Sequence, residues 1–284
     1  MNMRANNGRW SWGFITLATF FIFFVIFLYG PTFGIILLSF QGPEGGLTFP
    51  LNGFSFHWFE QLFKEQRVGD FKSSFLRSFV LAIIVMTLTV AFSLAAGLAY
   101  RKHFFGETFV FYLTVASLIV PSILLTLGIG LMFDQLSLEA SWYSSGLGAH
   151  LTWTLPFGLL IMFAVFNRFD KSFEEAARDL GASPWQVLRF VIIPIIGPSL
   201  IGVGLFGFTL SFDEFARSLL AVGSKNTLPL EIFGMTTTVT TPTLYALGTV
   251  TTGVSFLIIG LCLGAVVWIQ RRQAKFGSDS GKGV

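Results

Sequence analysis

Two adjacent acidic residues, Asp213 and Glu214, directly follow a long apolar stretch. Carboxylates at membrane depth are costly unless they face a cavity or a partner, so this pair could attract a cationic solute. Asp134 ends another apolar stretch, and Tyr245 offers an aromatic face on which a cation could stack. Two structural alternatives stay open. The acids could cap a helix or pair with Arg217, and the aromatic ring could be an interface anchor.

Residue patterns typical of enzymes are not found in the sequence. The histidines His57, His103 and His150 lie far apart, and no two of them have metal-ligand spacing on one helix face. There is no nucleophile elbow, no pair of catalytic carboxylates and no glycine-rich phosphate loop ending in Lys-Ser/Thr. The lone Cys262 can form neither an internal disulfide nor a paired zinc site. We therefore expect no catalysis, no metal and no cofactor in this chain, and we interpret the histidines as loop or interface structure.

Residues 167–190 form the most polar internal segment and carry two sets of helix signals. Ser172 followed by Glu175 predicts a capping box, and Gly181 stands where a left-handed residue would end the helix. The start signals then repeat, which predicts a second helix with Ser183 as its cap, Pro184 as its first residue and Gln186 completing a second box.

The first of these two helices is expected to have an apolar and a polar face. Spacing of three and four residues gathers Phe173, Ala176, Ala177 and Leu180 on one face. The opposite face, turned toward water or a partner, would hold Glu174, Arg178 and Asp179. A helix, a glycine turn and a helix could dock into a partner protein, or the element could pack on its own bundle as an interfacial helix.

Composition places most of the chain in lipid. Of the 284 residues 53% are hydrophobic and 12% are charged, and the mean hydropathy is +0.72. These values leave too little polar surface for a water-soluble globule of this length. The basic residues are spread over loops, so we expect no nucleic-acid binding.

Six apolar stretches are long enough to cross the bilayer, which predicts one all-α transmembrane domain over residues 1–284. The spans are residues 14–40, interpreted as an uncleaved anchor, and residues 73–100, 107–133, 148–166, 191–212 and 244–269. Twelve of the 18 Lys and Arg residues fall on the side that holds both termini and the 167–190 segment. That side is therefore expected to be cytoplasmic, and residues 41–72 to form a periplasmic loop.

The cytoplasmic segment resembles the EAA loop of permease subunits in binding-protein-dependent ABC importers. That motif reads Glu-Ala-Ala, three residues, Gly, nine residues and Ile-x-Leu-Pro. The matching residues are Glu175, Ala176, Ala177, Gly181, Val191, Ile193 and Pro194. The spacing is kept throughout, and only Val191 and Ile193 depart from the motif, both conservatively.

Further segments resemble the spermidine/putrescine permeases within that family, over roughly residues 54–269. They are residues 179–183, 208–214, 228–232 and 245–249. Permeases for iron(III), sulfate, phosphonate and opines share much of this framework, so these substrates remain alternatives to a polyamine. A stand-alone secondary transporter, which should show intramembrane charge relays or an internal repeat, is the less favoured alternative, because neither feature is evident.

The resemblance implies a set of partners and roles. It implies a six-helix permease in the bacterial inner membrane that pairs with a second permease subunit and an ATPase dimer. ATP and Mg would be bound by the ATPase, and a periplasmic or lipid-anchored binding protein would deliver the substrate. The residues expected to couple the permease to the ATPase are Glu174, Glu175, Ala176, Ala177, Leu180, Gly181 and Pro194.

Overall fold

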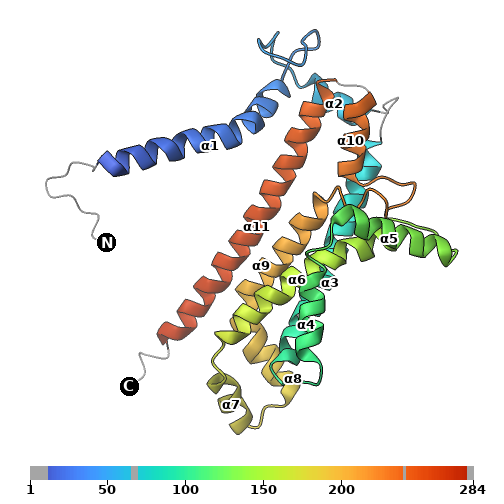
Figure 1. Ribbon diagram of the computed structural model, residues 1–284. Coiled ribbons are helices and arrows are strands. Elements are labelled where there is room, and N and C mark those ends of the chain that lie inside the picture. Colours follow the sequence, from blue (N-terminus) through green and yellow to red (C-terminus); the bar gives the residue numbers. More distant parts are fainter. Residues whose placement is uncertain (1–11, 65–69, 239–240, 280–284) are drawn as a thin grey trace. The chain divides into compact units, whose positions relative to one another are not determined.

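The computed structural model describes residues 12–64, 70–238 and 241–279, and these residues form helices joined by turns (Figure 1). Besides helices, the described residues contain one isolated β-bridge, between Gln41 and Phe54. The predicted all-α class is confirmed. The helices are α1 (Trp12–Leu38), α2 (His57–Leu62), α3 (Phe71–Tyr100), α4 (Glu107–Ala116), α5 (Ser122–Gln135), α6 (Ser145–Asn167), α7 (Ser172–Asp179), α8 (Pro184–Val187), the π-helical turn Leu188–Ile192, α9 (Ile193–Phe212), α10 (Leu228–Thr238) and α11 (Thr243–Asp279).

Five helical segments in the described residues are long and apolar enough to cross a membrane. They are α1, α3, α6, the continuous run Pro184–Phe212 and the Thr243–Arg272 part of α11. Each of them overlaps one of the predicted spans.

The remaining predicted span, residues 107–133, is formed by two shorter helices and not by one continuous helix. It contains α4 and α5, which are about 15 and 21 Å long at 1.5 Å per residue, too short to cross about 30 Å of hydrocarbon singly. The helix is interrupted between Ser117 and Pro121, where proline lacks an N–H and disfavours helical geometry in the residue before it. The total of six crossings and the side on which the termini lie stay predictions.

The chain divides into two compact units, which are described separately. The first comprises Met1–Arg67 and Thr238–Gly253, and the second comprises Val68–Thr237 and Val254–Val284. In the first unit, the fully buried Gln41 organises the turn after α1. Its side-chain amide donates to the carbonyl of Gly46 (3.2 Å) and accepts from the N–H of Asn52 (2.6 Å).

The core of the second unit is formed by α3, α6 and α9, which pack closely because small residues lie between them. A Cβ on Gly158 of α6 would lie 2.1 Å from the Ser93 hydroxyl oxygen of α3. A hydrogen bond of 2.9 Å joins the hydroxyls of Thr89 and Thr154, again between α3 and α6. These contacts fix the two helices at a short distance from each other.

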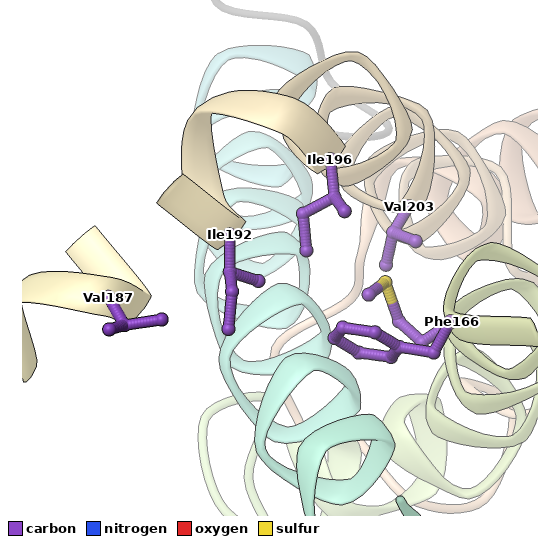
Figure 2. Close-up of a cluster of buried hydrophobic side chains, with 6 residues drawn as sticks. Phe166, Val187, Ile192, Ile196 and Val203 are labelled. Carbon is purple, nitrogen blue, oxygen red and sulfur yellow. The ribbon is translucent and has the colours of Figure 1, made fainter. Parts of the chain in front are cut away.

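One buried apolar cluster connects the core to the segment that follows α6. Its members come from α6, α8, the π-helical turn and α9, and are Met162, Phe166, Val187, Ile192, Ile196 and Val203. Figure 2 shows the side chains of Phe166, Ile196 and Val203 turned toward one another between their helices. α8 is thereby attached to the transmembrane bundle, and Ala177 of α7 packs against the same cluster.

Candidate functional site

The predicted start of α7 is placed correctly, but the predicted capping box is wrong. Helix α7 begins at Ser172 without a side-chain cap. The carboxylate of Asp170 instead accepts a hydrogen bond of 2.9 Å from the backbone N–H of Ser172. Because this bond favours the charged form, it lowers the pKa of Asp170 below its ordinary value. Asp170 thus accepts the hydrogen bond from the backbone N–H at the helix start, and Ser172 is the first helical residue.

The glycine turn and the second cap are confirmed. Gly181 has a φ of +83°, in the left-handed region, and its N–H donates to the carbonyl of Arg178 (2.8 Å). Ser183 and Gln186 form a complete capping box, in which the Gln186 side chain accepts from the Ser183 N–H (2.7 Å). Pro184 is the first residue of α8. The chain therefore runs from helix to glycine turn to helix as the sequence predicts.

On α7, the prediction that Glu174 faces water or a partner is wrong, whereas Arg178 and Asp179 are exposed as predicted. Glu174 is buried and Ala177 half-buried on the side that packs against the bundle, whereas Phe173 and Leu180 are exposed. The cause is Arg101 at the end of α3, whose guanidinium pairs with the Glu174 carboxylate at 2.5 Å. An ion pair of this kind makes burial of a carboxylate possible, and it turns the apolar side chains outward.

The outward side chains form an apolar surface, which we call the docking surface. It consists of the exposed residues Phe173, Leu180, Trp185 and Phe190. Leu180 is 89% exposed, and it borders a hollow of about 310 Å³ that Gly181 and Gln186 also line. Glu175 and Ala176 are exposed beside it on α7. Several exposed apolar side chains beside polar neighbours are typical of a protein interaction site.

The docking surface is linked to a transmembrane helix by a continuous helical path. α8 passes through the π-helical turn Leu188–Ile192 into α9, and Pro194 lies in the first turn of α9. Proline has no N–H to donate and its ring crowds the carbonyl four residues earlier, so a wider turn at this position accommodates it. A displacement of α8 would therefore reach α9 directly.

The acids predicted to line a substrate path lie in different surroundings. Glu214 is paired with Arg217, whose backbone N–H donates to the carboxylate at 2.8 Å and whose guanidinium lies 3.4 Å from it. Arg217 is 3% exposed, and its guanidinium lies 4.4 Å from the ring centre of Trp153. Asp213, at the end of α9, is exposed. Of the two neighbouring acids, Glu214 is buried and Asp213 is exposed.

The other two predicted path residues are Asp134 and Tyr245, and each has surroundings of its own. Asp134 is exposed near the end of α5. Tyr245 belongs to the first unit, where its hydroxyl donates to the carbonyl of Leu47 at 2.8 Å. Asp213 and Glu214 lie close to each other simply because they are consecutive in the chain.

Sequence reasoning missed a buried polar link centred on His150. This residue lies inside α6, not in a loop, and its two ring nitrogens are 2.8 Å from the Ser211 hydroxyl and 3.0 Å from the Ser218 hydroxyl. It ties α6 to the end of α9 and to the segment that follows. His150 and Trp153 are three residues apart on one face of an apolar helix. That spacing could have indicated a polar contact surface.

Comparison with known proteins identifies the family. The family model described as binding-protein-dependent transport system inner membrane component matches residues 88–275, most of the second unit. The chain belongs to this family. It is a permease subunit of an ABC importer and a multi-pass protein of the inner membrane, and the curated members it matches are permease subunits rather than enzymes.

Curated relatives match over most of their length. The spermidine/putrescine transport system permease protein PotC of Haemophilus influenzae is 31% identical, over 83% of this chain and 90% of the relative. The putrescine transport system permease protein PotI of Escherichia coli K12 is 26% identical, over 88% of each chain.

Solved structures support the fold alone. A bacterial ABC transporter involved in import of the acidic polysaccharide alginate matches with a TM-score of 0.59 at 18% identity, over 92% of this chain and 95% of that chain. The MetNI methionine ABC transporter, in an inward-facing conformation, matches with a TM-score of 0.54 at 15% identity, over 69% and 94%. The two transporters carry different substrates, so the shared fold does not indicate one.

Proposed function

We propose that this permease imports polyamines of the spermidine and putrescine class. The observation that carries the proposal is the match to permeases named for these substrates over more than four-fifths of each chain. The exposed carboxylate of Asp213 at the end of α9 agrees with a cationic substrate. Glu214 contributes little free charge, because Arg217 neutralises it within the protein.

The same proposal assigns α7, the Gly181 turn and α8 as the coupling element. The docking surface would enter a cleft of an ABC ATPase, with Glu175, Ala176 and Leu180 at the contact. A dimeric ATPase has two such clefts, so a second permease subunit would complete the translocation path. The ATPase would hold ATP and Mg, and a periplasmic or lipid-anchored binding protein would supply the substrate. Six crossings would leave both termini in the cytoplasm.

Substrate class is tested by uptake in proteoliposomes that contain this permease with its partner permease, ATPase and binding protein. Labelled spermidine should accumulate, and excess putrescine should compete whereas sulfate and a phosphonate should not. Ligand identification on the binding protein gives an independent answer. An anion or iron(III) found there would refute the polyamine assignment, because neither is a polyamine. An anion would also be repelled by the carboxylate of Asp213.

The coupling assignment is tested by photo-cross-linking. A photoreactive amino acid at Leu180, which is 89% exposed, should capture the ATPase in membranes. The matched control is Val187, which is 1% exposed inside the cluster of Figure 2 and should capture only the permease itself. Capture of lipid alone at Leu180 would contradict the assignment.

A further inference from the structure

Arg101 joins three helical elements at one end of the second unit. It directly follows the last residue of α3, and its guanidinium pairs with Glu174 of α7 at 2.5 Å. The same guanidinium lies 5.0 Å from the ring centre of Phe166, in α6, and 5.3 Å from that of Phe169, in the turn that leads to α7. In Figure 1, α7 lies at the end of the unit where α3 turns into α4. One side chain thus contacts the ends of two transmembrane helices and the helix proposed to meet the ATPase.

The local sequence explains why Arg101 lies there. Gly97, one helical turn earlier, lets α3 approach α6 so closely that a Cβ at this position would lie 2.8 Å from the Phe166 ring. Residues four apart lie on the same helix face, so Arg101 continues that contact over the same ring. A cation also interacts favourably with the carbonyl end of a helix. The sequence of α3 therefore places the guanidinium over the Phe166 ring, where α7 also contacts it.

Glu174 has no equivalent alternative partner in the described residues. Arg178, one turn later on α7, reaches the carboxylate only at 3.9 Å and its side chain is 61% exposed. A second hollow, of about 420 Å³, is lined by Arg101 and Glu174 and also by Lys102 and Lys171. Neither lysine forms an ion pair among the residues that the structure describes. The Glu174 side chain is 12% exposed, so removing Arg101 would leave a nearly buried carboxylate with one weak, solvent-screened contact.

We propose that Arg101 and Glu174 form an internal strut that transmits movement of α7 to α3 and α6. The proposal rests on the coupling role proposed above for α7. The chain itself connects α7 to α9 through α8, and the strut adds a second connection to the two helices that pack against α9. Glu174 then acts inside the permease as a positioning residue, whereas the exposed Glu175 faces the ATPase. With both connections intact, α3, α6 and α9 move as one body when α7 is displaced.

The test uses the full complex with its ATPase, partner permease and binding protein, and it compares complex abundance, ATP hydrolysis and substrate uptake. Glu174→Gln and Arg101→Gln should assemble and hydrolyse ATP, but uptake per ATP should fall tenfold or more. The double reversal Arg101→Glu with Glu174→Arg should restore most of that loss. Arg101→Lys should be intermediate, because lysine keeps the charge but not the planar contact with the rings. Lys102→Gln, the matched control, should leave uptake per ATP unchanged.

Two patterns would overturn the strut. In the first, the single variants lose complex and uptake in equal proportion, and the double reversal gives no rescue. In the second, the single variants keep wild-type uptake per ATP while Gly181→Val abolishes coupling. If Gly181→Val and Glu175→Gln also transport normally, the coupling element itself is wrongly assigned, which separates failure of the strut from failure of the proposed function.

A distance measurement tests the strut without changing it. Spin labels at the exposed positions 102 and 179, in a Cys262→Ser background, report the separation between the end of α3 and α7. The strut predicts the same distance distribution in the nucleotide-free complex and in the complex trapped with ATP and vanadate. A shift in that distribution between the two states would overturn it.

Discussion

The left-handed turn at Gly181 allows a sharp test of the coupling element, because its surroundings are open. A Cβ at this position would meet no atom within 4 Å, so the cost of a substitution comes from the backbone φ of +83° and not from a clash. A residue with a Cβ in this region costs about 1 to 2 kcal/mol, which is about a five- to thirtyfold change in an equilibrium constant. Asparagine and aspartate tolerate the left-handed region better than alanine does, and β-branched valine tolerates it worst.

A series at this position therefore separates strain from charge. Affinity of the ATPase for the solubilised permease should fall in the order Gly, Asn, Ala, Val at residue 181, with Ala about five- to thirtyfold weaker than Gly. Gly181→Asp has the same shape as Gly181→Asn, so any further loss measures the negative charge against the ATPase surface. The affinity is measured by titrating labelled ATPase, and insertion by the amount of permease in the membrane. Equal affinity for Gly, Ala and Val at normal expression would refute the reasoning, because docking would then not need this turn.

Three further predictions follow from individual contacts. Asp213→Asn should lower polyamine uptake per complex about tenfold, the equivalent of about 1.4 kcal/mol, whereas Glu214→Gln should mainly lower the amount of folded complex, because it breaks a buried ion pair. Uptake and complex abundance, measured together, distinguish a transport defect from a folding defect. Equal effects of both variants on uptake per complex would contradict the different roles assigned to Asp213 and Glu214. Gly158→Ala should destabilise the protein by about 1 to 3 kcal/mol, seen as a lower melting temperature, because its Cβ would overlap a hydroxyl oxygen of α3 at 2.1 Å; an unchanged melting temperature would contradict that packing. In a cysteine-free background, a thiol at Asp179 should be labelled only from the cytoplasm and one at Glu139 only from the periplasm, since both positions are exposed; labelling of both from one side would exclude the predicted topology.

The fold was predictable where a local signal was strong and unbroken. Apolar runs of more than 18 residues gave α3 and α6 to within three residues at either end. The interruption at Pro121 was missed, because the apolar pattern continues on both sides of it and only the proline marks the break. A helix boundary that depends on a single residue inside a uniformly apolar stretch does not change the hydrophobic pattern, so the pattern cannot reveal it.

The site was predictable to the same extent that its contacts are local. The Gly181 turn and the Ser183 cap depend on residues three or four apart, and both are confirmed. The burial of Glu174 depends on Arg101, which is 73 positions away in the chain, and the surroundings of Glu174 were predicted wrongly. The contacts of His150, to hydroxyls 61 and 68 positions away, were missed for the same reason. Side-chain partners on separate helices leave no periodic trace in one sequence.

The central claim, that ATP hydrolysis by a partner drives import through this permease, is tested most directly by reconstitution. Proteoliposomes should contain the two permease subunits and the ATPase, with ATP enclosed on the ATPase side and loaded binding protein outside. Our account predicts spermidine accumulation that stops when ATP, the ATPase or the binding protein is left out, and that a proton gradient does not replace. Accumulation that continues without ATP and follows an imposed ion gradient would contradict it.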